Sequence, residues 1–234
     1  PDGAMPGTDH ARRRPDAVVY REITNTPAAA RALTYARLAG AVDEFAAGIR
    51  GTFPAGSTLV IRIPNTCDYP VAFLGTLAAG CAAFPVPADV AEPELRAAIE
   101  QSAAVALVGP GLKVEPTGRS PSSEQSRHGL LLQSSGTTGR PKIVYRPAAA
   151  VDAVCRNMVG AISVRESDRV LATVPLCHSY GLEHGLLTPM TAGASVHLCQ
   201  GFDLHLVVSQ LTGGGVTTFP AVPSMFEMLA QLAD

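Results

Sequence analysis

The chain has 234 residues, of which 47% are hydrophobic and 16% charged, and its formal net charge is −2. This length can bury a sizeable core, while the near-neutral charge argues against a nucleic-acid partner and the low charge density against a disordered chain. No apolar run reaches the roughly 18 residues that a membrane span needs. Residues 1–11 lack the apolar core of a signal peptide and are expected to be a flexible lead-in. The five widely spaced cysteines contain no CxxC pair, which disfavours disulfides and zinc and favours a reducing, cytoplasmic location.

Strands and helices alternate in the first part of the chain, residues 12–108. Apolar side chains at helical spacing, from Leu38 to Ile49, predict a helix that Thr34 caps at its amino end. Runs rich in β-branched and apolar residues predict strands. The expected strands are 18–20, 57–63, 81–86 and 104–108, and the other expected helices are 68–79 and 93–102.

Residues 109–128 are rich in Gly, Pro and Ser and are expected to be a surface linker. The alternation resumes in a second block, 129–234. Together the two blocks predict an α/β fold of βαβ units around mostly parallel sheets. The strands expected after the linker are 130–133, 143–145, 169–174, 194–198 and 216–219, and the helices are 148–161, 182–190, 204–211 and 224–232.

A loop rich in glycine and hydroxyl groups joins two of these strands. It reads Ser134-Ser135-Gly136-Thr137-Thr138-Gly139-Arg140-Pro141-Lys142. Backbone amides and hydroxyls in such a loop can converge on an anion, and a following lysine adds a charge matched to phosphate. The spacing fits neither a Walker A loop nor a GxGxxG loop. The sequence therefore predicts a polyphosphate-binding loop, with an ordinary hairpin turn as the alternative.

This loop resembles the phosphate-binding signature of the adenylate-forming enzymes, which include acyl- and aryl-CoA synthetases, peptide-synthetase adenylation domains and luciferases. Other segments resemble the same family in the same order. The resemblance covers residues 12–234 and implies the α/β fold of the family's large N-terminal domain, incomplete. These segments are 33–38 (LTYARL), 77–86 (LAAGCAAFPV), 175–181 (PLCHSYG) and 217–224 (TTFPAVPS).

The resemblance implies that ATP and a carboxylic acid form an acyl-adenylate and pyrophosphate. The acyl group then passes to a thiol, either coenzyme A or the phosphopantetheine of a carrier protein. Mg²⁺ would share the phosphate charge. The residues that would surround the β- and γ-phosphates are Ser134, Ser135, Gly136, Thr137, Thr138, Gly139 and Lys142.

His178 occupies the position of the family histidine that lies near the acid and the α-phosphate, which makes it the candidate catalytic residue; a structural histidine is the alternative. Cys177 is expected to be a packing residue. The other histidines are expected to be structural or exposed, and no metal ligand is predicted. By resemblance, the acid substrate would contact His178, Gly181, Phe219, Val222 and Pro223. For the last three, ordinary core packing is an alternative at least as strong.

Amino-acid-activating members of the family carry an aspartate in this region, and the chain has none between Asp168 and Asp203. An acid without an α-amino group is therefore preferred. The chain also departs from the family at Ile143, which stands where glycine is usual, and near Arg146, where a histidine is common. The family's later adenine, ribose and catalytic-lysine segments have no match.

The resemblance favours the N-terminal portion of an acid–thiol ligase that is inactive alone and needs the remainder of the enzyme. One half of a split ligase, with a complementary chain as partner, is an alternative. A non-catalytic nucleotide-binding module is another, and it predicts a closed polar surface where the ligase predicts an apolar docking face. A hydrolase is disfavoured, because residues 193–197 lack the final glycine of a nucleophile elbow.

Overall fold

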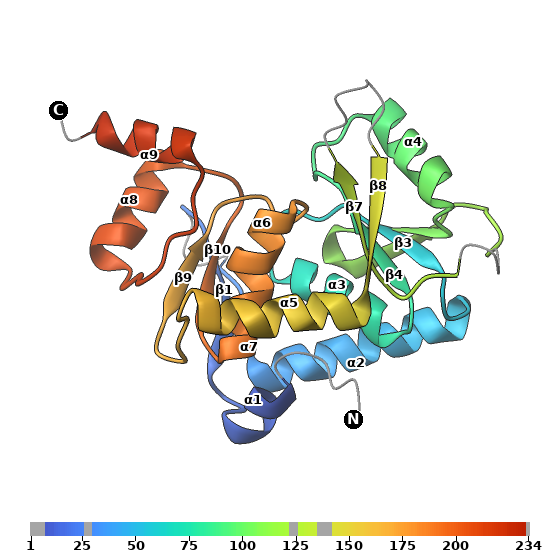
Figure 1. The fold of residues 1–234 in the computed structure, drawn as a ribbon, viewed down its shortest axis with the longest axis horizontal. Coiled ribbons are helices and arrows are strands. Elements are labelled where there is room, and N and C mark those ends of the chain that lie inside the picture. Colours follow the sequence, from blue (N-terminus) through green and yellow to red (C-terminus); the bar gives the residue numbers. More distant parts are fainter. Residues whose placement is uncertain (1–7, 26–29, 122–125, 135–141, 233–234) are drawn as a thin grey trace. The chain divides into compact units, whose positions relative to one another are not determined.

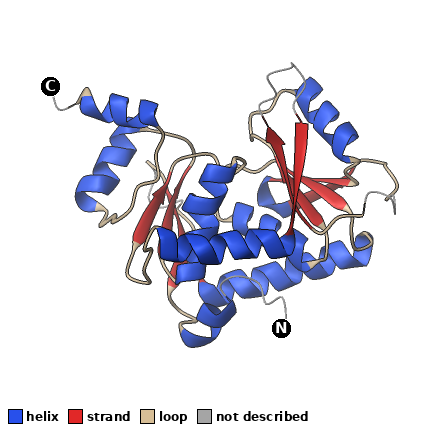
Figure 2. Cartoon of the chain, viewed as in Figure 1, coloured by secondary structure: helices blue, strands red, loops and turns tan. Residues whose placement is uncertain are grey.

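The computed structural model describes residues 8–25, 30–121, 126–134 and 142–232, which form helices and two β-sheets (Figure 1). Figure 2 shows the strands gathered into these two sheets. The chain divides into two compact units that are interleaved in the sequence. The first unit contains Leu38–Pro64 and Asp68–Val154, and the second contains Pro6–Arg37, Asn65–Cys67 and Cys155–Asp234.

The first unit contains a six-stranded sheet in the order β6-β5-β3-β4-β7-β8. β5, β3, β4 and β7 are parallel, whereas β6 and β8 are antiparallel edge strands. β3 and β4 are buried along their whole length, as expected for central parallel strands. The strands are β3 (Thr58–Ile61), β4 (Ala82–Pro85), β5 (Ala106–Gly109), β6 (Lys113–Pro116), β7 (Gly129–Ser134) and β8 (Lys142–Pro147).

Helices cover this sheet. Leu95 and Ala98 of α4 pack against Val60, Phe84 and Leu131 of the strands and form one hydrophobic core. α4 carries a proline in its first turn and ends at a residue in the left-handed conformation. The helices are α2 (Tyr35–Thr52), α3 (Asp68–Ala78), α4 (Glu92–Ser102) and α5 (Ala148–Ala161), of which α2 and α5 contribute residues to both units, and the short 3-10 helix η2 (Pro110–Leu112).

The second unit contains a four-stranded sheet in the order β2-β1-β10-β9, in which β1, β10 and β9 are parallel and β2 is antiparallel. Tyr20 and Tyr35 are buried in it. The Tyr35 hydroxyl donates to the carbonyl of Ala194 at 3.0 Å, and burial raises the pKa of both tyrosines well above its ordinary value. The strands are β1 (Val18–Ile23), β2 (Ala32–Thr34), β9 (Arg169–Ala172) and β10 (Ser195–Cys199).

The helices of the second unit include one composite helix. The helix expected at 182–190 runs from Ser179 to Ala192 and contains a π-helical turn between two α-helical segments. The elements are α1 (Thr8–Arg13), α6 (Ser179–Leu182), the π-helix η4 (Glu183–Leu187), α7 (Thr188–Ala192), α8 (Leu204–Gly213) and α9 (Pro223–Ala230). Within the described ranges, no helix combines the length and the apolar character that crossing a bilayer requires.

Several expectations from the sequence require correction. Residues 113–116 of the expected linker form β6, which pairs with β5 through the tight turn at η2. The expected lead-in contains α1, whose His10 is buried and bonds through Nε2 to the carbonyl of Thr191 at 3.0 Å. The expected strand 216–219 is reduced to one bridge, between Thr218 and Val170. The interleaved units do not match the expected blocks 12–108 and 129–234, because β7 pairs with β4 across residues 109–128.

Candidate functional site

The candidate phosphate loop begins at the carboxyl end of β7 and returns into β8. Ser134 is the last residue of β7, Lys142 is the first of β8, and the two are direct partners in the antiparallel ladder. β7 runs parallel to β4, so Ser134 lies at the carboxyl edge of the parallel strands, where ligands of open α/β sheets bind. Five predicted loop residues lie outside the described residues: Ser135, Gly136, Thr137, Thr138 and Gly139.

The base of this β7–β8 hairpin is firmly anchored. The Tyr145 hydroxyl donates to the carbonyl of His128 at 2.9 Å and accepts the His128 amide at 3.2 Å. The His128 ring bonds through Nε2 to the carbonyl of Leu77 at 2.9 Å. Gly129 has φ +152°, and a Cβ there would collide with the backbone of Arg146 and Pro147. Leu130 and Leu131 are buried, so β7 is held in the core of the first unit.

His178 lies in the second unit, on the connection that leaves the carboxyl end of β9. It is the N-cap residue of α6: its amide donates to the carbonyl of Pro175 at 3.1 Å, and its own carbonyl accepts the Leu182 amide at 2.9 Å. Its side chain is exposed. The main chain around His178 is therefore fixed, while the imidazole is accessible to a ligand.

Asn65 is a residue that the sequence analysis missed. Its side chain is 5% exposed and bonds three backbone groups of the β9–α6 connection. Nδ2 donates to the carbonyls of Val174 at 3.0 Å and Ala172 at 3.5 Å, and Oδ1 accepts the Leu176 amide at 3.0 Å. The only feature of the sequence that could have pointed to Asn65 is its position as a polar residue shortly after a buried strand.

Gly181 has a structural reason to be glycine. It is buried, and a Cβ at this position would collide with the carbonyl oxygen of Pro175. The close approach packs the start of α6 against the turn that precedes His178. Cys177 is buried beside His178, in agreement with the expected packing role.

The segment 219–223 leaves the second unit's sheet at the same edge as His178. Thr218 pairs with Val170 in parallel, so the residues that follow each of them emerge from the carboxyl ends of neighbouring strands. Phe219 packs against the core of Leu171, Cys199 and Val207, and its ring contacts Phe226 edge-on at 6.0 Å.

The next two candidates, Val222 and Pro223, are the N-cap and the first residue of α9. Val222 is half-buried and Pro223 is exposed. Core packing therefore accounts for Phe219, while Val222 and Pro223 remain accessible. Within the second unit, the structure places His178, Gly181 and 219–223 at one edge of the sheet; Ser134 and Lys142 belong to the first unit.

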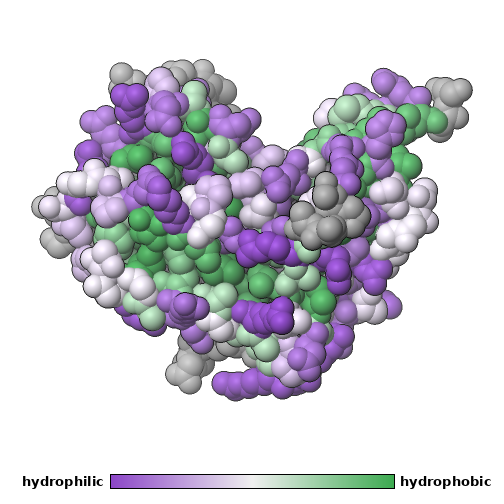
Figure 3. Space-filling model, turned by 180° about the vertical axis from the view of Figure 1, so that it is seen from behind, coloured by the Kyte–Doolittle hydropathy of each residue, from purple (hydrophilic) through white to green (hydrophobic). Residues whose placement is uncertain are grey.

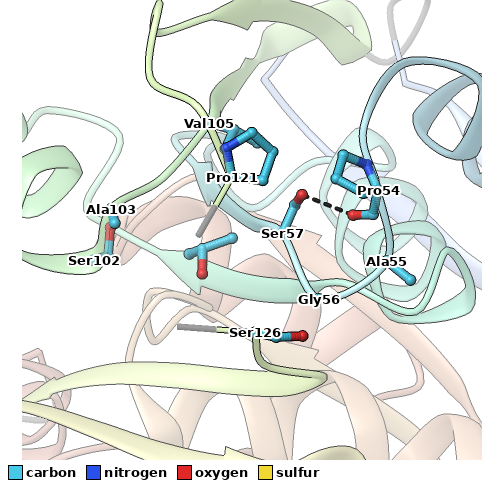
Figure 4. Close-up of a pocket in the computed structure, with 10 residues that line it drawn as sticks. Pro54, Ala55, Gly56, Ser57, Ser102, Ala103, Val105, Pro121 and Ser126 are labelled. Carbon is cyan, nitrogen blue, oxygen red and sulfur yellow. Dashed lines mark hydrogen bonds between the residues drawn. The ribbon is translucent and has the colours of Figure 1, made fainter. Parts of the chain in front are cut away.

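A hollow in the first unit lies at the other edge of its sheet. It has a volume of about 510 Å³ and lies at the amino ends of β3 and β5 (Figure 4). Its lining consists of residues 54–58, Ser102, Ala103, Val105, Pro121 and Ser126. The Ser57 hydroxyl donates to the carbonyl of Pro54 at 2.7 Å. The described lining contains no charged side chain.

Comparison with known proteins identifies the family. The family model described as AMP-binding enzyme matches residues 8–133 and 130–234. The chain belongs to this family. A curated relative of this chain is a CoA ligase of Gibberella moniliformis, 28% identical over an alignment of 190 positions that covers 68% of this chain and 32% of that protein. A feruloyl-CoA synthase of an Amycolatopsis species is 28% identical over 224 residues, covering 85% of this chain and 45% of that protein.

A solved structure shows the same fold as this chain. The inhibitor-bound N-terminal domain of FACL13 from Mycobacterium tuberculosis matches with a TM-score of 0.82 over 95% of this chain and 63% of that chain, at 21% identity. The expected fold class, the N-terminal α/β part of an adenylate-forming enzyme, is confirmed. The chain spans less than half the length of the curated relatives named above.

Proposed function

We propose that the chain is the N-terminal part of an ATP-dependent ligase that converts a carboxylic acid to an acyl-adenylate and passes the acyl group to a thiol. The observation that carries this proposal is the sequence SSGTTGRPK at residues 134–142. It begins with Ser134 at the carboxyl end of parallel β7 and ends with Lys142 at the start of β8. An acid without an α-amino group is preferred, because no aspartate lies between Asp168 and Asp203 to pair with an ammonium group.

In the proposed first step, a carboxylate oxygen of the acid attacks the α-phosphorus of ATP. The new bond joins that oxygen to phosphorus, the bond to the bridging oxygen of the β-phosphate breaks, and pyrophosphate leaves with the bonding electrons. The loop amides, its hydroxyls and the Lys142 ammonium would stabilise the charge that develops on pyrophosphate. A thiol of coenzyme A or of a carrier-protein phosphopantetheine then attacks the acyl carbon, and AMP leaves.

Mg²⁺ bound to the triphosphate would add positive charge beside the leaving group. Among the described residues, no group of three or more His, Cys, Asp or Glu is arranged to hold a metal ion. None of the described residues is assigned to the ion, because Mg²⁺ on a nucleotide is held largely by the substrate phosphates and water.

His178 is assigned to the acid and the α-phosphate. Its fixed main chain and exposed imidazole, at the carboxyl edge of the second unit's sheet, support a role in orienting the reacting carboxylate. Val222 and Pro223, which emerge from the same edge, are assigned to the wall of the acyl-binding surface, with Phe219 as its support from the core.

The exposed surface supports a ligase that continues beyond this chain. Leu211, Phe226, Met228 and Leu232 are large apolar side chains, 37–52% exposed, on and beside α8 and α9. Hydrophobic side chains are also visible on the molecular surface in the view of Figure 3. An apolar patch of this kind marks an interaction surface, and the matched part of this chain covers only 32% and 45% of the two curated relatives named above. We assign the patch to the remaining part of the enzyme or to a complementary chain, an arrangement that favours the ligase over an independent nucleotide-binding module.

The test measures nucleotide binding and turnover by the purified chain in a reducing buffer. Calorimetry is expected to show that ATP and pyrophosphate bind more tightly than AMP, since AMP lacks the β- and γ-phosphates that the loop holds. Acid-dependent exchange of pyrophosphate into ATP is expected to be weak or absent. Equal affinity for AMP and ATP would overturn the phosphate-loop assignment, and vigorous exchange would overturn the claim that the chain is inactive alone.

A further inference from the structure

One face of the second unit's sheet carries a group of basic and polar side chains. In the parallel register Arg21 of β1 is level with His197 of β10, and Ser195 of β10 is level with Arg169 of β9. Level residues of parallel strands point to the same face, and so do residues two apart along one strand. Arg21, Arg169, Ser195 and His197 therefore share one face.

The two halves of that face differ in polarity. At the carboxyl half, Leu171 and Cys199 pack against Val207 of α8 in a hydrophobic core. At the amino half, α8 instead places Gln210 on His197, with 2.8 Å between the Gln210 Oε1 and the His197 Nδ1. The amino half is thus a polar surface within a sheet face that is otherwise apolar.

A hollow of about 590 Å³ opens over this polar half, and its lining contains three arginines and two carboxylates. Arg14 pairs with Glu166 at 2.7 Å. The Asp168 carboxylate accepts hydrogen bonds from the Arg165 amide at 2.7 Å and the Thr217 hydroxyl at 2.9 Å. Both acidic groups of the lining are therefore already engaged.

Two of the three arginines have no carboxylate partner in the part of the chain that the structure describes. Arg169 donates through Nη1 to the carbonyl of Gly214 at 2.7 Å, and no described acidic side chain pairs with the exposed Arg21. Burial lowers the pKa of His197 below its ordinary value; the hydrogen bond with Gln210 opposes this shift, and the nearby Arg169 and Arg21 add to it. This shift favours the neutral imidazole. The two arginines without a described carboxylate partner give the hollow an excess of positive charge.

The hydrogen bond to Gln210 decides which proton the neutral imidazole keeps. Because the Gln210 oxygen can only accept, Nδ1 of His197 carries the hydrogen and Nε2 has a free lone pair. Nε2 has no hydrogen-bond partner among the described residues. The hollow therefore offers guanidinium donors together with one acceptor, which is the complement of an anion that has a hydroxyl group.

We propose that this hollow binds a small hydroxyl-bearing oxyanion, either hydrogen phosphate or a hydroxycarboxylate. Its anionic oxygens accept hydrogen bonds from Arg21 and Arg169, and its hydroxyl donates to Nε2 of His197. This site differs from the residues assigned to the ligase reaction. It lies at the amino ends of β1, β9 and β10, whereas His178 follows the carboxyl end of β9, at the opposite edge of the sheet.

Two matched anion pairs test the role of the hydroxyl. The Lys142→Ala chain, in which the proposed phosphate loop is weakened, is titrated with phosphate against sulfate and with malate against succinate, following the His197 ring signals by NMR. In each pair only the first anion has a hydroxyl at pH 7. At least one hydroxylated anion is expected to bind with saturation, and about tenfold more tightly than its partner. Saturable binding of phosphate identifies the ligand as hydrogen phosphate, and saturable binding of malate identifies it as a hydroxycarboxylate.

A matched pair of variants tests the contribution of the arginine side chains to anion binding. Arg21→Gln is expected to weaken binding about tenfold, whereas Arg37→Gln, which changes an exposed arginine elsewhere in the same unit, is expected to leave it unchanged. The proposal is overturned if no anion shifts the His197 signals with saturation. It is also overturned if the two anions of each pair bind equally, or if the two arginine variants behave alike.

Discussion

The buried side chain of Asn65 holds the main chain of Leu176, two residues before His178, through an Oδ1 acceptor 3.0 Å from the Leu176 amide. The same side chain donates to the carbonyl of Val174 at 3.0 Å. A residue more than 100 positions away in the sequence therefore fixes the turn that presents the candidate catalytic histidine. Its amide group can serve both sides of the turn because it contains both a donor and an acceptor.

Replacing Asn65 with leucine is expected to lower the free energy of unfolding by about 2–4 kcal/mol, because it leaves buried backbone groups of Val174 and Leu176 without partners. Urea denaturation measures the change. Asn25→Leu is the control: the exposed Asn25 amide donates to Asp203 at 3.3 Å, so its loss is expected to cost less than about 1 kcal/mol. Equal effects of the two substitutions would contradict the anchoring role of Asn65.

Gly181→Ala is expected to destabilise the chain by about 1–3 kcal/mol, because the added methyl group collides with the carbonyl of Pro175. Gly160→Ala is the matched control. Gly160 lies in α5 with no atom near a Cβ position, so alanine there is expected to stabilise the helix by about 0.5–1 kcal/mol. Thermal denaturation should move the two midpoints in opposite directions, and a shared direction would show that Gly181 tolerates a side chain.

Local patterns in the sequence predicted the buried strands and the candidate loop, but not how distant segments combine. β3 and β4 were predictable because their apolar runs are continuous. The phosphate loop, indicated by a string of Gly, Ser and Thr with a specific chemistry, stays a prediction. The pairing of Tyr20 with Val196 joins strands that have no local signal for each other. Asn65 was missed for the same reason: its partners are residues that only the tertiary fold brings near.

Lys142→Ala is expected to weaken ATP binding about tenfold or more, because the ammonium group no longer meets the phosphates. The chain contains one other lysine, Lys113, which is exposed in β6 and pairs with Glu115 at 2.6 Å. Lys113→Ala is therefore a matched control and is expected to leave ATP affinity unchanged. Calorimetry gives both affinities, and denaturation confirms folding. A loss of stability in Lys142→Ala without a loss of affinity would make Lys142 structural.

His178→Ala in the full-length enzyme is expected to lower the rate of adenylate formation at least tenfold while ATP affinity is largely kept, because the exposed imidazole is assigned to the acid and the α-phosphate. Pyrophosphate exchange measures the rate. His205→Ala, which removes an exposed imidazole from α8, is the control and is expected to leave the rate unchanged. Normal exchange by His178→Ala would remove His178 from the site.

Acid is expected to destabilise the chain partly through His197. Burial lowers the folded-state pKa of His197 below the ordinary value of 6.5, so the unfolded chain takes up a proton at a higher pH than the folded chain does. The contribution of His197 to stability is therefore complete above about pH 6.5 and is lost as the pH falls toward its folded-state pKa.

Urea denaturation between pH 8 and pH 5 measures this dependence. His197→Gln is expected to flatten the decline below pH 6.5, because glutamine has no proton to gain, whereas the same substitution at the exposed His205 is expected to leave the decline close to that of the wild-type chain. Both variants remove one imidazole, so a difference between their pH dependences of stability is due to the burial of His197. Identical slopes for the two variants would show that protonation of His197 costs the folded chain nothing.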